Sequence, residues 1–130
     1  MPHSQATQNA PRELQEQVVQ AALSLPGVSE ADSLVSVPGA RAFVLDEQLA
    51  RGPDEAFQAG REFAHVHPAH DGSLHMTLPE RVARVVRETG WGEPHPVSGT
   101  MLVFGPRDQS ELEVVTALLR ASYEFARGEP

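Results

Sequence analysis

Histidines are concentrated in one stretch of this chain. Four of the six lie between Glu62 and Leu78, in the sequence EFAHVHPAHDGSLHMTL. His65 and His67 alternate with apolar residues, as on a strand whose successive side chains point to opposite faces. Two imidazoles on one strand face, roughly 6.6 Å apart, can bind Zn²⁺ or another borderline metal that takes three or four ligands. The spacing therefore predicts two histidines that share one face of a strand.

The stretch is typical of two short strands joined by a tight turn. Asp71-Gly72 favours a type I′ hairpin turn, because glycine and Asx residues tolerate the positive φ that this turn needs. The register of the hairpin decides where His75 lies. A two-residue turn pairs His67 with Met76 and sends His75 to the opposite face. A three-residue loop or a bulge instead sets His67 opposite His75, and the sequence leaves both registers open.

Strand alternation also assigns the neighbouring residues to faces. Phe63 is predicted on the face of His65 and His67, with Ala64 and Val66 on the reverse. The second strand is predicted to place Leu74, Met76 and Leu78 on one face and His75 and Thr77 on the other.

Several residues could act together with these histidines. Asp71, Glu93 and His95 could supply further metal ligands. Histidine is also the commonest general base near neutral pH, and Glu62, Asp71 or Glu93 could orient one. No serine or threonine sits in a nucleophile elbow and no carboxylate pair stands out. We therefore assign no catalytic residue, and we assign neither a metal nor another cofactor.

The histidines could instead be structural. In that interpretation His67-Pro68 stabilises the end of a strand, His75 faces solvent and the other imidazoles satisfy backbone carbonyls. Trp91 and His95, in the sequence GWGEPHP, carry a similar alternative. A lone tryptophan in an irregular loop either covers the core or, if exposed beside the histidines, contacts a ligand. The predicted ligand-binding residues are His65, His67, His75, Trp91 and His95.

Arginines supply all ten basic residues. Arg81, Arg84 and Arg87 share a broad helix face, and with Arg61 and Arg107 they could bind an anion at a helix N-terminus. The alternative is a solvated face that carries ion pairs four residues apart along the helix, such as Arg84 with Glu88.

Length and composition set limits on the class of protein. A chain of 130 residues is long enough for one core, and we expect a disordered tail over 1–9 and a single domain over 10–130. There is no cysteine, and there is neither a signal peptide nor an apolar run of roughly 20 residues, so a cytoplasmic protein without a membrane partner is expected. The formal net charge of −8 disfavours nucleic-acid binding.

The other elements predict an α+β fold around the histidine hairpin. Helices are expected near 11–25, 79–89 and 108–126, and further strands near 33–37, 41–45 and 100–104, with one helical turn near 54–58. Asp108 followed by Glu111 has the form of a capping box at the start of the last helix. The predicted order is α-β-β-β-β-α-β-α, with about five antiparallel strands and the helices packed on one face.

Four segments carry a resemblance to a known family: FAHVHPAHDGSLHMTLP (63–79), GWGEPHP (90–96), MLVFGPRD (101–108) and LLRASYEFA (118–126). From about Leu23 to Ala126 the chain resembles short bacterial proteins of the luciferase-domain family. The layout, beginning with LPGVSE (25–30), is also similar to the MmcQ/YjbR-like family, which implies an α+β double-wing fold. Neither resemblance implies a catalytic residue, and no dinucleotide, phosphate or flavin motif accompanies it.

These observations lead to two functional hypotheses of different classes. The first is a binding or interaction module whose ligand, a small molecule or a protein, lies between the histidine hairpin and the Trp91–Pro96 loop. The alternative is a histidine- or metal-dependent enzyme that acts on a small molecule. DNA binding through the arginines is a third hypothesis, which the net charge opposes.

Overall fold

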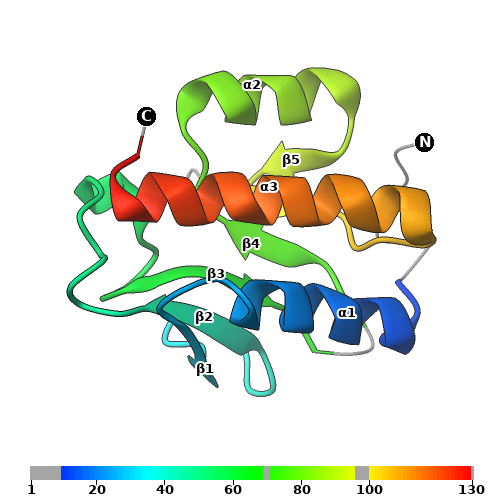
Figure 1. Ribbon diagram of the computed structural model, residues 1–130. Coiled ribbons are helices and arrows are strands. Elements are labelled where there is room, and N and C mark those ends of the chain that lie inside the picture. The colour runs from blue at the N-terminus through cyan, green and yellow to red at the C-terminus, as the bar shows by residue number, and fades with distance from the viewer. Residues whose placement is uncertain (1–9, 69–70, 96–99, 130) are drawn as a thin grey trace.

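Six strands form one antiparallel sheet in the order β1-β2-β3-β4-β6-β5 (Figure 1). The computed structural model describes residues 10–68, 71–95 and 100–129, so the tail predicted at 1–9 lies outside the described residues. The strands are β1 (Val28–Asp32), β2 (Arg41–Leu45), β3 (Glu62–Val66), β4 (Leu74–Met76), β5 (Gly92–Pro94) and β6 (Met101–Val103). The helices are α1 (Arg12–Leu23), α2 (Glu80–Thr89) and α3 (Gln109–Arg127), with a 3-10 turn η1 (Asp54–Ala56). The predicted α+β class is confirmed, with one strand more than expected.

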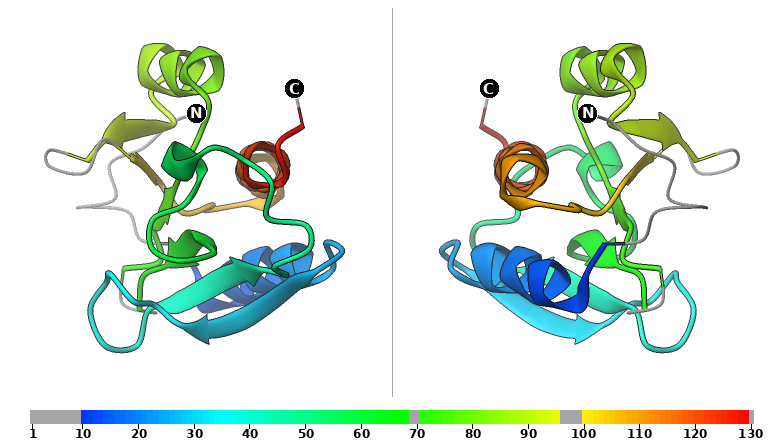
Figure 2. Two further views of the ribbon diagram at one scale, coloured as in Figure 1. Left: turned by 90° about the vertical axis from the view of Figure 1, so that its left-hand side faces the viewer. Right: turned by 90° about the vertical axis from the view of Figure 1, so that its right-hand side faces the viewer.

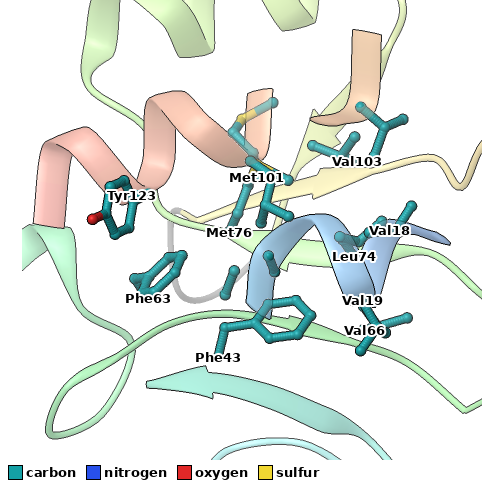
Figure 3. Packing of buried hydrophobic residues seen from close by; sticks show 14 of the residues in the cluster. Val18, Val19, Phe43, Phe63, Val66, Leu74, Met76, Met101, Val103 and Tyr123 are labelled. Carbon is teal, nitrogen blue, oxygen red and sulfur yellow. The ribbon is translucent and has the colours of Figure 1, made fainter. Parts of the chain in front are cut away.

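Helices α1 and α3 pack beside each other against the sheet. Figure 3 shows the core between them, where Val18 and Val19 of α1 and Tyr123 of α3 meet Phe43 and Phe63 of the central strands. These side chains come from the apolar positions of each element, which recur every third or fourth residue on a helix. Burial of these apolar side chains fixes the orientation of the sheet relative to helices α1 and α3.

Helix α2 lies against β5 at the end of the sheet opposite β1 (Figures 1 and 2). Its buried Ala83 and Val86 join the same core. Pro79 precedes α2, and Gly90 ends it in the left-handed conformation with φ of 79°, as the sequence predicts. Among the described residues, no helix combines the length and apolarity that crossing a bilayer requires.

The capping box predicted for the last helix is present at α3. The Asp108 side chain accepts a hydrogen bond from the Glu111 backbone N–H at 2.9 Å. The Glu111 carboxylate reaches back to the Arg107 backbone N–H at 2.8 Å rather than to that of Asp108. This arrangement sets the start of α3, so its apolar stripe faces the sheet.

The strand predicted over 33–37 is wrong. The partner of β2 is β1, from Val28 to Asp32, and residues 33–40 connect the two strands. Four of the five β1 residues are exposed, so this edge strand lacks the apolar alternation by which strands are recognised. The apolar residues Leu34, Val35 and Val37 instead lie in the connecting loop and are 75%, 54% and 57% exposed.

The two-residue turn predicted at Asp71-Gly72 is also wrong. The His67 N–H donates to the carbonyl of Ser73 at 2.9 Å, so the loop runs from Pro68 to Gly72, with 69–70 outside the described residues. Gly72 does adopt a positive φ of 79°. His65 pairs with His75 across β3 and β4, which is neither of the two registers that the sequence left open.

Phe63 lies on the helix side of the sheet, against the prediction from simple alternation. The register of β2 with β3 passes from Phe43 opposite Ala64 to Val44 opposite Glu62, which leaves Phe63 as the extra residue of a bulge. Its ring packs edge-on to Tyr123 of α3, with 6.1 Å between centroids. The bulge therefore places both Phe63 and Ala64 in the core. The Glu62 side chain lies on the same face of the sheet as His65.

Candidate functional site

Three histidines meet on the sheet face that points away from α1 and α3. His65 on β3 lies directly opposite His75 on β4, and His67 follows two residues after His65 on the same face. Ring centroids are 5.2 Å apart for His65 and His75, 5.1 Å for His65 and His67, and 4.7 Å for His67 and His75. The His95 ring lies on the other side of His75, with 4.8 Å between centroids. We call these four residues the histidine cluster.

Glu62 fixes the tautomer of His65. Burial raises the pKa of Glu62, but hydrogen bonds from His65, the Leu34 N–H and the Ser33 hydroxyl outweigh it and hold the pKa below its ordinary value. Glu62 is therefore an ionised acceptor, and Nδ1 of His65 must donate to it at 2.9 Å. The Nε2 atom of His65 is left with its lone pair directed away from Glu62.

Asp71 fixes the tautomer of His67 through a hydroxyl. The Ser73 hydroxyl donates to Asp71 Oδ1 at 2.6 Å, so its oxygen accepts the hydrogen bond from Nδ1 of His67 at 2.8 Å. His67 thus also carries its proton on Nδ1 and presents an unprotonated Nε2. Two carboxylates, one direct and one through Ser73, hold two imidazoles in the same tautomer.

The electrostatics of the site favour neutral rings at His67 and His75. Loss of solvent lowers the pKa of His75 to about 4, and the neighbouring histidines add to the effect. Loss of solvent and the proximity of His65 also lower the pKa of His67, while Asp71 opposes the shift. At neutral pH these two rings therefore offer lone pairs and no positive charge. A pKa of about 4 also makes His75 a weak general base.

The cluster forms part of the wall of a cavity of about 1000 Å³. This volume is at the upper end of what small-molecule sites in proteins occupy. Apolar side chains form another part of the lining and come from the 33–40 loop, the residues just after η1 and β4, and the end of α3. These side chains are Val35, Val37, Phe57, Leu78 and Phe125. The cavity thus has a polar end at the sheet and an apolar side.

Two polar groups in the cavity wall lack partners. The side-chain amide of Gln58 and the Nε2 atom of His65 are buried and make no hydrogen bond to any of the described residues. Native proteins leave few buried polar atoms unpaired, so each calls for an explanation. A bound ligand that faces both groups provides one.

Comparison with known proteins connects this site to one family. The profile of the Luciferase domain matches residues 60–122, which begin just before β3 and end within α3. The chain belongs to the luciferase-domain family. The matched segment contains the whole histidine cluster with Glu62, Asp71 and Ser73.

The relatives of this luciferase domain include fungal proteins that are named luciferase. Those of Armillaria gallica and Armillaria mellea are each 31% identical over 106 residues, which is 75% of this chain and 38% of the fungal protein. The luciferase of Neonothopanus nambi is 30% identical over 86 residues, or 59% of this chain and 32% of that protein. This chain thus spans about a third of the length of these relatives. No solved structure matches it.

The structure brings together four of the five residues predicted to bind a ligand. His65, His67, His75 and His95 all line the cavity of the luciferase domain. Trp91 does not line it and packs against the hydrophobic core. Strand β5 explains the separation, because it carries Trp91 before its first residue and His95 after its last. The Trp91 ring therefore covers the core, the structural alternative stated for it.

The other candidate ligands and cations do not join the three neighbouring imidazoles. Asp71 lines the cavity but acts on His67 through Ser73, and Glu93 is exposed on β5. The predicted pair of Arg84 with Glu88 is replaced by a bond from Arg87 to Glu80 at 2.8 Å. Arg107 pairs with Glu111, and Arg61 donates to the Leu45 carbonyl at 2.8 Å. The arginines therefore do not converge on one anion site.

Sequence reasoning missed parts of this site. Gln58 lies in a polar stretch without periodicity, and Val35 and Val37 fall within the strand that the sequence predicts over 33–37. The two valines could have been predicted as exposed loop residues, because they are apolar and lie next to Pro38-Gly39, a turn that exposes its neighbours. Nothing in the sequence singles out Gln58.

Proposed function

We propose that this luciferase domain binds a small organic molecule in the histidine cavity, with the polar end of the ligand against the sheet. The observation that carries the proposal is the pair of buried, unpartnered groups in the wall, the Gln58 amide and Nε2 of His65. A buried polar group without a partner costs about 1–3 kcal/mol, so a ligand that supplies both partners recovers that free energy on binding.

The electrostatics of the cavity indicate the kind of ligand. Neutral imidazoles accept hydrogen bonds and do not attract anions, which favours a hydroxyl or phenol over a carboxylate or phosphate. The apolar side of the cavity, including Val35, Phe57 and Phe125, suits a planar or aliphatic body. A mostly apolar molecule with a hydroxyl at one end therefore matches both walls.

The test uses planar phenols and their methyl ethers as probes, in the first instance 7-hydroxycoumarin and 7-methoxycoumarin. Fluorescence titration of the full chain is expected to show the phenol binding about 10-fold more tightly than the ether, because only the phenol donates a hydrogen bond. Gln58→Ala and Phe57→Ala are expected to weaken binding, and the exposed Gln20→Ala serves as the matched control. If no phenol binds, or if Gln58→Ala and Gln20→Ala behave alike, the proposal is wrong.

A second candidate function is catalysis on the bound molecule. It is favoured by the name luciferase on the fungal relatives, although this chain spans only 38% of the Armillaria proteins. The tightest phenol of the panel is incubated in air with wild type and with His67→Ala, and its conversion is followed by liquid chromatography. Conversion by wild type alone supports an enzyme. A bound probe that stays unchanged leaves binding as the function.

A further inference from the structure

Three imidazoles of the cluster bring ring nitrogens close together. One nitrogen from each of His65, His67 and His75 lies within 4.8 Å of the other two. The Nδ1 atoms of His65 and His67 are already engaged by Glu62 and Ser73, so their Nε2 atoms carry free lone pairs. The His75 side chain makes no hydrogen bond to the described residues, only ring contacts.

An organic hydroxyl alone cannot satisfy this arrangement. A hydroxyl donates one hydrogen bond and a water molecule donates two, whereas three imidazole nitrogens lie close together here. A cation with three open coordination positions satisfies all three together. The buried and unpartnered Nε2 of His65 is an independent sign of a missing partner at this point, because the residue is only 2% exposed.

We infer that His65, His67 and His75 bind one divalent transition-metal ion, such as Zn²⁺, at the polar end of the cavity. Imidazole ligands suit zinc, copper, iron and nickel, whereas magnesium and calcium prefer oxygen ligands. Three protein ligands leave at least one coordination position open, as in catalytic rather than structural zinc sites. That position faces the cavity, so the inference deepens the proposed function and rests on it for the identity of the remaining ligand.

The outer partners fit the same inference. Histidine ligands of metals commonly donate their second ring N–H to a carboxylate, which fixes the tautomer and the ring orientation. Glu62 does this for His65, and Asp71 does it for His67 through Ser73. A purely structural role for the two rings does not require that both expose the same nitrogen to the cavity.

Small side-chain rotations complete the coordination. Zn–N bonds of about 2.0–2.1 Å place tetrahedral ligand nitrogens roughly 3.4 Å apart. Nitrogens that now lie within 4.8 Å of one another close to that distance by rotation of the half-buried His67 and His75. His65, held by Glu62 in the core of the sheet, stays as the fixed ligand.

Metal binding by the full chain, freed of metal by chelation and dialysis, tests the inference. Isothermal titration with Zn²⁺ is expected to give one ion per chain, and Co²⁺ is expected to show the visible absorption of a tetrahedral site. His67→Ala and His75→Ala should each weaken Zn²⁺ binding by about 100-fold or more, and Glu62→Gln by about 10–100-fold. Gln20→Ala, exposed on α1 and outside the cavity, is the matched control and should change it by no more than about threefold.

Folding and ligand binding are separated by two further measurements. Circular dichroism shows which variants are folded, and His75→Gln, closer in size, replaces His75→Ala if that variant unfolds. Phe57→Ala removes an apolar wall and should lose 7-hydroxycoumarin while keeping Zn²⁺, so the proposed function and the metal site can fail separately. The inference is overturned if Zn²⁺ does not bind at about millimolar concentration, or if it binds equally well when both His67 and His75 are replaced.

Discussion

The two faces of the β3–β4 pair show how the same strands serve two purposes. On the helix side, Val66, Leu74 and Met76 are buried with partners that only need to be apolar and of the right size. On the other side, the His65 ring is held by the Glu62 carboxylate and keeps an unpartnered Nε2, and the His75 ring makes no hydrogen bond to the described residues. The apolar side chains on the helix face stabilise the fold. The imidazoles on the histidine face line the cavity, and a stable fold does not require them there.

The largest effect is expected on the helix face. Leu119 of α3 is 1% exposed within the core, so Leu119→Ala should lower the free energy of unfolding by about 2–5 kcal/mol through lost burial and a cavity. Denaturant titration measures this change. A loss under about 1 kcal/mol would mean that α3 is not docked on the sheet.

Glu62 lies on the histidine face but is fully buried, and its replacement should give an intermediate effect. Glu62→Ala removes the acceptor for His65, the Leu34 N–H and the Ser33 hydroxyl, which leaves one buried donor, Nδ1 of His65, and two partly buried donors unpaired. We expect a loss of about 1–3 kcal/mol in the same titration. Hydrogen exchange at Leu34 should also become faster, and an unchanged exchange rate would show that Glu62 does not hold the loop.

A smaller effect on stability is expected for His67, although its effect on binding should be large. If the ring serves a ligand or a metal, His67→Ala should change the free energy of unfolding by no more than about 1 kcal/mol while abolishing binding of Zn²⁺. If the ring is structural, the same variant should cost about 1–3 kcal/mol because the Ser73 hydroxyl loses its partner. A strongly destabilised protein with unchanged binding would contradict the comparison of the two faces.

The smallest effect on stability is expected in the exposed loop. Val35 is 54% exposed and lines the cavity, so Val35→Ser should leave the free energy of unfolding within about 0.5 kcal/mol of wild type. Binding of 7-hydroxycoumarin should weaken, because an apolar contact is lost. Val85→Ser on α2 is the control, since Val85 is also 54% exposed and does not line the cavity. Equal binding by the two variants would remove the loop from the site.

Local patterns in the sequence determined much of this protein. The three helices, the end of α2 at Gly90 and the cap at Asp108 follow from periodicity and from residues with strong local preferences. The shared face of His65 and His67 follows from the period of a strand, because side chains two residues apart must point the same way. The family resemblance, carried by four segments of the chain, is confirmed by the match to the luciferase domain. The similarity to the MmcQ/YjbR-like layout stays a prediction.

Only the tertiary structure decided the features that depend on distant parts of the chain. The register that sets His65 opposite His75 depends on a loop from Pro68 to Gly72. Alternation of side chains along the strands does not predict how many residues that loop contains. The bulge at Phe63 is stabilised by packing against Tyr123, sixty residues later in the chain. The unpartnered Gln58 and the apolar Val35 reach the histidines through folding of the β1–β2 loop and η1, which have no periodicity to read. Sequence spacing thus identified the chemistry, and long-range packing assembled the cavity around it.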